Sequence, residues 1–377
     1  MFKFKDYDFK HYNVSILLVI MTLGSIGMVL IQKLQDSNER QFEKQVMGYL
    51  VGIAFAIVVS LIDYHFICKF FIPLYVLNFI LLFIVKFTPL GKAHYDAKRW
   101  ILIPGINMEV QPSELTKIIM ILFMAKFFDL TRRQINKASV ILLALVLMGI
   151  PTVLILIQTD LSTSIVLAVT CMAIFFVAGL SYKIILPVIV VGVPAFVGIF
   201  WYVQQPYQIL LNEYQQGRIL AILHPEEYPD LMWQQTNAAK AIQSGGMVGK
   251  LLKDEGASLK SGLVPVIESD FIFTAIAEAF GFVGSVIVIG LFIILIFKII
   301  QIAKRAKDFL GMLIATGIAS LITFQIFVNI GVVTSLLPNT GIPLPFVSSG
   351  LSALLGSMLM VGILLNVSLQ GSKVKEV

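Results

Sequence analysis

Acidic side chains stand at the edges of long apolar stretches in this chain, where a charge is unfavourable without a partner. Asp270 follows Glu268-Ser269 and precedes the apolar run Phe271-Ile272-Phe273, and Glu278 comes soon after it. Burying a charge in hydrocarbon costs several kcal/mol and is tolerated mainly in a cavity or beside another polar group. A carboxyl held in such a place has a raised pKa and can act as a general base.

Asp270, Thr274 and Glu278 recur at every fourth residue, which predicts one stripe of a helix. At 1.5 Å per residue Glu278 would lie about 12 Å below Asp270, so it should face protein or water rather than lipid. Two interpretations of Asp270 stay open on these grounds. It is either the N-cap of the helix at the water boundary or a general base.

Three cations and two further carboxylates lie at other span ends. Lys117 stands three residues after Glu114 behind Gln111-Pro112-Ser113, so the two side chains share one helix face. They form either a local ion pair or a site in which Lys117 points to a cavity beside Arg99. Asp160 either caps the helix that follows it or belongs to the site. Arg218 either snorkels at the interface or binds phosphate.

The elements that position these residues are membrane spans. The chain is 58% hydrophobic and 13% charged, with a mean hydropathy of +0.91, which excludes an ordinary soluble domain. Its net charge of +6 comes from scattered basic residues, a distribution that argues against nucleic-acid binding. We expect one all-α membrane domain over residues 1–377 with about ten helices. The expected spans are 13–32, 44–62, 66–87, 113–130, 138–157, 162–180, 182–203, 270–299, 309–333 and 345–367.

Basic residues recur in every second loop along the chain. Lysines near the N-terminus share one face with the basic loops around Lys69, Arg132, Lys183 and Lys304, which predicts that this face and both termini are cytoplasmic. The other face carries the segments 88–112 and 204–269, the second being a long extracellular loop between spans seven and eight. The cations of these two segments have two explanations. Either long loops cross the membrane during insertion regardless of their charge, or the cations bind an anionic ligand on the outer face.

An ordered set of short motifs runs along nearly the whole chain and resembles the SEDS family of bacterial cell-wall proteins, which includes RodA, FtsW and SpoVE. The matching pieces are Lys98-Arg99-Trp100-Ile101, Gln111-Pro112-Ser113-Glu114-Leu115, Asp160-Leu161, Arg218-Ile219-Leu220, Gln243-Ser244-Gly245-Gly246, Asp270-Phe271-Ile272-Phe273 with Ala277-Glu278, and Gly341-Ile342-Pro343-Leu344-Pro345-Phe346-Val347-Ser348. The sequence departs from the family pattern at Glu268-Ser269, at Ala279 and within Ser348-Ser349-Gly350-Leu351-Ser352, where Ser349 replaces the usual tyrosine and Leu351 one of two glycines. The short termini favour the RodA branch.

The resemblance implies a peptidoglycan glycosyltransferase of the cytoplasmic membrane that polymerises lipid II beside a class B penicillin-binding protein, for cell elongation or division. It implies Asp270 as the catalytic residue, and the chemistry agrees, because the reaction needs one base and several cations for undecaprenyl pyrophosphate. Candidate pyrophosphate ligands are Arg99, Lys117 and Arg218, with Mg²⁺ or Mn²⁺ as a candidate cofactor. Supporting residues are Glu114, Asp160, Glu278 and Ser348. The alternative is a lipid II flippase or transporter without glycosyl transfer.

Overall fold

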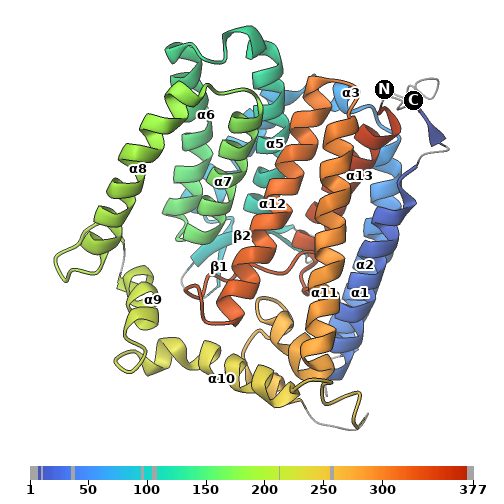
Figure 1. Cartoon of the computed structure of the whole chain (residues 1–377), viewed down its shortest axis with the longest axis vertical. Helices are drawn as coiled ribbons and strands as arrows, with labels where there is room; N and C mark the ends of the chain where they lie inside the picture. The colour runs from blue at the N-terminus through green and yellow to red at the C-terminus, as the bar shows by residue number, and fades with distance from the viewer. Residues whose placement is uncertain are drawn as a thin grey trace.

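The computed structural model describes residues 7–9, 12–34, 39–94, 97–103, 108–211, 213–254 and 259–371. Ten long helices form the bundle seen in Figure 1. They are α1 (Val14–Leu34), α2 (Glu39–Ser60), α4 (Phe71–Phe87), α5 (Pro112–Thr131), α6 (Ala138–Ile157), α7 (Leu161–Val177), α8 (Tyr182–Val203), α11 (Ile272–Arg305), α12 (Phe309–Val333) and α13 (Leu351–Leu369).

Each expected span overlaps one of these ten helices. Within the described residues, seven are long and apolar enough to cross a membrane, namely α1, α2, α6, α8, α11, α12 and α13. The helices α4 and α7 are apolar but have only 17 residues each. The helix α5 has 20 residues and carries four charged side chains. The prediction of an all-α polytopic membrane protein is confirmed.

The two ends of the bundle differ. Both chain termini lie at one end, together with the short helix α3 (Tyr64–Cys68), and we call this the terminal end (Figure 1). The opposite end, called the loop end, carries α9 (Glu213–Leu223) and α10 (Pro229–Gly245). Two single-turn 3₁₀ helices, Arg132–Gln134 and Lys260–Leu263, complete the helical segments that the structure describes.

The most buried helices are α12 and α13, together with α5. Small residues allow close helix packing, because they let backbones approach. A Cβ atom on Gly362 of α13 would lie 2.8 Å from the carbonyl oxygen of Ala56 in α2. At the edge of the bundle, by contrast, α8 has its apolar side chains exposed, as expected for a surface that faces lipid (Figure 1).

A small antiparallel sheet lies at the loop end and was not expected from the sequence. It consists of β1 (Gly91–His94), β2 (Ala97–Ile103) and β3 (Met108–Val110), in the order β1-β2-β3. Lys92 and Glu109 on the two outer strands are paired at 2.6 Å. The sheet occupies the segment between α4 and α5, and it carries Arg99 on its central strand.

Several expected span boundaries are displaced by two to six residues, and two of these displacements affect the site. The eighth span was expected from residue 270, but α11 begins at Ile272, so Asp270 lies in the turn before the helix rather than on its stripe. The tenth span was expected from residue 345, whereas α13 begins at Leu351. Residues 345–350 instead form a turn in which Phe346 and Gly350 have φ angles of +65° and +143°.

The helix α11 is broken at Gly281, which has φ 67° and ψ −163°. Main-chain groups of residues 246–251 replace the lost helical bonds there. Phe282 N–H donates to Gly246 O over 2.9 Å, and Lys250 N–H donates to Glu278 O over 3.0 Å. Glycine is required because Cβ atoms on Gly281 and Gly249 would collide with the backbone of the opposing segment. The backbone of the loop after α10 is therefore hydrogen-bonded to α11 at its kink.

Candidate active site

Asp270 lies in the last turn before α11. The N-cap of α11 is Phe271, which makes no side-chain capping bond, so the N-cap interpretation of Asp270 is wrong. Its carboxylate oxygen Oδ1 instead accepts a hydrogen bond of 2.8 Å from the hydroxyl of Ser269. The side chain is thus available at the loop end of the bundle, outside the spanning helix.

A second segment closes over the Asp270 carboxylate. Gly341, in the turn between α12 and α13, has a φ of +69°, and a Cβ atom there would lie 3.2 Å from Asp270 Oδ2. The neighbouring Thr340 carbonyl accepts a hydrogen bond of 2.8 Å from the hydroxyl of Ser162 at the start of α7. Glycine therefore leaves space beside the acid that a larger residue would fill.

Two arginines from distant parts of the chain flank this position. Arg99 on β2 donates from Nη2 to the carbonyl of Thr159 over 2.6 Å, and its Nη1 lies 3.9 Å from Asp160 Oδ2. Arg218 on α9 donates from Nη1 to the carbonyl of Asn339 over 2.7 Å. Both guanidinium groups are close enough to Asp270 to act on its ionisation. The structure thus brings Asp270, Arg99, Arg218 and Asp160 together.

Burial raises the pKa of Asp270 above the ordinary value for an aspartate. The hydrogen bond from Ser269 and the charges of Arg218 and Arg99 lower it, whereas the charge of Asp160 raises it again. Burial prevails, because desolvation penalises the charged form more than these partners stabilise it. A carboxylate with a raised pKa is a better proton acceptor than an ordinary one.

Asp160 both caps α7 and lies near Arg99. Its Oδ1 accepts a hydrogen bond of 3.1 Å from Thr163 N–H, so it is the N-cap of α7 as one interpretation predicted. Its Oδ2 meanwhile faces Arg99. Thr159, just before it, has a φ of +63°, which turns its carbonyl group toward the same arginine.

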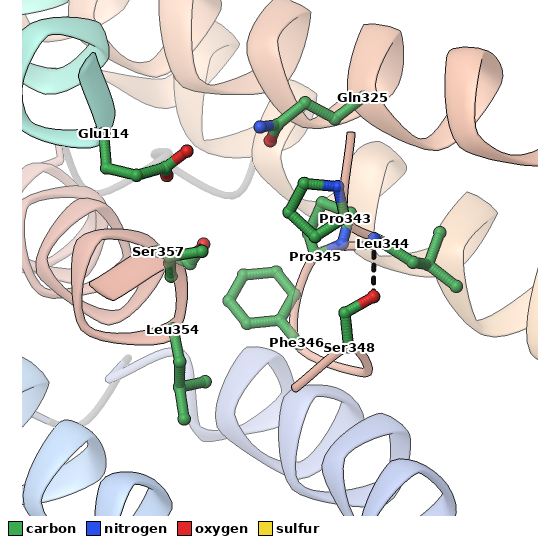
Figure 2. Close-up of a pocket in the computed structure, with 10 residues that line it drawn as sticks. Glu114, Gln325, Pro343, Leu344, Pro345, Phe346, Ser348, Leu354 and Ser357 are labelled. Atoms are coloured by element: carbon green, nitrogen blue, oxygen red, sulfur yellow. Dashed lines mark hydrogen bonds between the residues drawn. The ribbon is translucent and has the colours of Figure 1, made fainter. Parts of the chain in front are cut away.

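Lys117 and Glu114 form the local ion pair that was one of the two interpretations. The distance from Lys117 Nζ to Glu114 Oε1 is 2.8 Å, and the two residues are 3% and 7% exposed. Within the described residues Lys117 has no other partner, so the expected position beside Arg99 is not supported. Glu114 lines a small pocket between α5, α12, α13 and residues 343–348 (Figure 2).

Ser348 borders the same pocket and braces the turn that carries Asp270. Its hydroxyl accepts a bond of 2.8 Å from Leu344 N–H and donates one of 2.5 Å to the carbonyl of Ser269 (Figure 2 shows the bond to Leu344). Its own carbonyl accepts a bond of 3.1 Å from the Gln45 side chain. Ser348 therefore supports the residue next to Asp270.

Glu278 lies apart from the Asp270 cluster. It is fully buried and faces protein, as expected. Its carboxylate pairs with Lys250, accepts a bond of 2.6 Å from Ser261 N–H and accepts another of 3.1 Å from Ser244 Oγ. All three partners belong to the end of α10 and the loop after it, so Glu278 anchors that loop to α11.

Three residues contribute to the site in ways that the sequence does not indicate. Asn339 and Thr159 act through main-chain carbonyls, and Gly341 acts through the side chain that it lacks. Asn339-Thr340-Gly341 does carry a turn signal. Nothing in residue type, however, indicates which carbonyl an arginine will bind.

A family profile described as "Cell cycle protein", covering FtsW, RodA and SpoVE, matches residues 10–373. The chain belongs to the FtsW/RodA/SpoVE family. A relative from Trichlorobacter lovleyi, named probable peptidoglycan glycosyltransferase FtsW, is 34% identical over 97% of this chain and 95% of its own length. The Escherichia coli K12 protein named peptidoglycan glycosyltransferase MrdB is 32% identical over 96% of this chain and 94% of its own.

Solved structures show the same FtsW/RodA/SpoVE fold. A chain from a peptidoglycan synthase complex, described as coordinating polymerization and crosslinking, superposes with a TM-score of 0.80 at 24% identity, covering 95% of this chain and 97% of that one. RodA of Thermus thermophilus superposes with a TM-score of 0.69 at 24% identity, covering 95% and 96%. The ten-helix arrangement of this chain is therefore that of the family.

Proposed function

We propose that this chain is a peptidoglycan glycosyltransferase that polymerises lipid II and that Asp270 is its general base. The observation that carries the proposal is the half-buried Asp270 carboxylate with a raised pKa between Arg99 and Arg218. The names of full-length relatives at 32–34% identity support the reaction class.

The chemistry follows from this arrangement. Asp270 accepts the proton of the acceptor sugar's 4-hydroxyl, whose oxygen attacks the anomeric carbon of the donor. The bond between that carbon and the pyrophosphate oxygen breaks, and undecaprenyl pyrophosphate leaves. One displacement inverts the anomeric centre and gives a β-linked glycan. Arg99 and Arg218 stabilise the negative charge that develops on the pyrophosphate.

Lys117 is the third proposed pyrophosphate ligand. It would reach the phosphate by exchanging its bond to Glu114 at the edge of the pocket beside Ser348. Glu114, Asp160, Glu278 and Ser348 remain the proposed supporting residues. Of these, Asp160 and Ser348 touch the partners of Asp270 most directly, through Arg99 and Ser269.

A divalent cation would fit the same chemistry. The described residues contain no group of three or more histidine, cysteine or acidic side chains that could hold a metal. Mg²⁺ commonly binds through one or two carboxylates plus substrate phosphates. Asp160 could supply one such carboxylate, and the lipid-linked pyrophosphate would supply the other ligands.

We place the loop end outside a bacterial cytoplasmic membrane and the two termini in the cytoplasm. Basic residues gather in the segments at the terminal end, including Arg132, Arg133 and Lys137, as the positive-inside rule requires. A class B penicillin-binding protein is the proposed partner, in keeping with the synthase complex that matches the fold. The relatives include both FtsW and MrdB, so the proposed role is elongation or division, and the shape of depleted cells distinguishes the two.

The test uses the purified chain with its transpeptidase partner and lipid II. Asp270→Ala and Asp270→Asn should lower glycan synthesis by about 1,000-fold, within the range for loss of a general base. Glu268→Gln is the matched control, because it neutralises a nearby acid of the same turn, and it should retain activity near the parent rate. Parent-level synthesis by both Asp270 variants would refute the assignment. Movement of lipid II across vesicles without polymer would favour the transporter alternative.

A further inference from the structure

Asn329 joins the two segments that flank the Asp270 carboxylate. It belongs to α12 and is 1% exposed. Its Nδ2 donates to the carbonyl of Asp270 over 2.8 Å and to the carbonyl of Ile342 over 2.7 Å. A carboxamide nitrogen carries two N–H groups, so both donors are used. One side chain therefore sets the spacing of two main-chain segments.

The main chain at Asp270 lies outside the regular helix. Thr274 N–H donates to the carbonyl of Phe271 over 2.9 Å, and α11 begins at Ile272. The carbonyl of Asp270 is held instead by the bond from α12. Because α12 is among the most buried helices, it is a rigid support for the acid.

The second carbonyl belongs to the wall opposite the carboxylate. Ile342 follows Gly341, at which a Cβ atom would lie 3.2 Å from Asp270 Oδ2. The same segment contains Asn339, whose carbonyl holds Arg218. The span of the Asn329 side chain therefore also sets how far Asp270 lies from the segment that places Arg218.

We propose that Asn329 is a positioning residue that holds the Asp270 carboxylate in register with residues 339–342 and thereby with Arg218. The inference rests on the proposed function, in which Asp270 is the base. Asn329 acts through the main chain and contacts no reacting group. A displacement of about 1 Å in a reacting geometry can cost about 100-fold in rate.

The test compares Asn329→Ala with Asn366→Ala. Asn366 is the control because it is also a fully buried carboxamide whose Nδ2 donates twice, to Ser60 O over 2.7 Å and to Tyr7 Oη over 3.2 Å. Its Oδ1 also accepts bonds of 2.9 Å from Tyr64 N–H and from Gln370 Nε2, so the control removes at least as many hydrogen bonds as the test variant. It lies near the C-terminal end of α13, at the terminal end of the bundle. Both variants should lower the melting temperature, and the kinetics should separate them.

For Asn329→Ala we expect kcat to fall by about 100-fold with little change in KM for lipid II. The acid limb of the pH–rate profile should also move to higher pH, because a displaced carboxylate loses part of the effect of the cations that lower its pKa. Asn366→Ala should leave both kcat per folded protein and the acid limb as in the parent. Asn329→Ser keeps one hydroxyl donor and should give intermediate values.

Parent values of kcat and of the acid limb in Asn329→Ala would overturn the positioning role. Should the alanine variant not fold, the serine variant decides, and a parent-like acid limb in it has the same meaning. The parent protein is assayed first. Absence of polymer from the parent would reject the proposed function together with this inference, whereas an active parent with unaltered Asn329 variants rejects the inference alone.

Discussion

Arg99 Nη1 lies 3.9 Å from Asp160 Oδ2, so the cation that faces Asp270 is shared with a second carboxylate. Asp160 also raises the pKa of Asp270 directly, as a nearby like charge does. The pairing of Asp160 with Arg99 and the negative charge of Asp160 both raise the pKa of Asp270. Asp160 therefore sets how basic the proposed catalytic acid is, although it stands at the start of another helix.

We predict that Asp160→Asn moves the acid limb of the pH–rate profile to lower pH. The substitution removes a negative neighbour of Asp270 and leaves Arg99 to act on it more fully. Asparagine still caps a helix, so α7 should keep its stability. The measurement is glycan synthesis against pH, with the melting temperature as a control. An acid limb that stays in place would show that the two carboxylates are not coupled.

The pH at which the parent protein loses activity on the acid side can be predicted in direction. The pKa of Asp270 is raised by burial, so the active carboxylate form should be lost at a pH above the usual aspartate value of 3.8. Activity should fall as the pH falls through that raised value, as seen in kcat/KM for lipid II. A limb at or below the ordinary value would contradict a buried base.

Replacing Arg218 should impair use of the donor. Arg218→Ala is expected to lower kcat/KM for lipid II by about 100-fold, similar to the loss of one charge-stabilising donor. Arg218→Lys should recover only part of this, because lysine keeps the charge but not the planar fork. Lys240→Ala, which removes an exposed cation from α10, is the matched control and should have little effect. Equal losses in the two alanine variants would point to general charge instead of a specific ligand.

Glu278 should matter for the loop more than for the chemical step. Glu278→Gln leaves the partly exposed Lys250 without its charged partner and should cost about 2 kcal/mol, as for the loss of a hydrogen bond between charged groups. Adding Lys250→Met should restore part of the loss in a double-mutant cycle. The measurements are thermal unfolding and protease cleavage within residues 246–263. Full activity loss in a variant that unfolds like the parent would assign Glu278 to the reaction instead.

A histidine at the terminal end gives a separate pH dependence. His65 Nε2 lies 2.6 Å from Asp308 Oδ2 and its Nδ1 lies 2.8 Å from Asp63 Oδ1. The hydrogen bond to Asp308 is the largest cause that raises the pKa of His65. Burial raises the pKa of Asp308. The hydrogen bonds of Asp308 to His65, Gly311 and Tyr64 together lower that pKa by more, so the net shift is downward.

A raised histidine pKa means that the folded state binds the proton more tightly than the unfolded state. This stabilisation is complete below about pH 6.5, the ordinary value, and is lost as the pH rises through the raised value. Over that range we expect the melting temperature to fall in the parent and to fall less in His65→Gln. His224→Gln, which changes an exposed histidine in the loop-end segment, should keep the parent slope. Parallel slopes in all three proteins would exclude His65 as the cause.

The helices were predictable because apolar length is a property of composition. The ten apolar runs correspond in order to the ten long helices, and α5 begins at Pro112, one residue before the expected span. The small sheet was missed because its strands are three to seven residues long and lie between two spans. The start of α11 was missed because Asp270 continues the four-residue spacing of Thr274 and Glu278 without being helical.

The site was predictable as a set of side chains but not as a set of contacts. Asp270, Arg99 and Arg218 are unusual residues in an apolar chain, so their types reveal them. Lys117 illustrates the limit, because its spacing fits both a pair with Glu114 and a role in a cavity. The structure shows the pair, and the second role stays a prediction. The carbonyls of Thr159 and Asn339 could not be foreseen, since every residue type offers the same acceptor.

The main-chain junction at Gly281 separates two kinds of sequence change in the loop between α10 and α11. Its bonds run between backbone groups of residues 246–251 and α11, and Met247 and Val248 point outward, 63% and 46% exposed. The side chains of Met247 and Val248 can change without loss of these bonds, whereas Gly249 cannot, because a Cβ atom there would collide with α11. An inserted or deleted residue would move every later bond out of step. Positions 247 and 248 should therefore tolerate substitution but not a change of length, and this makes them a suitable place for a label and a poor one for a tag.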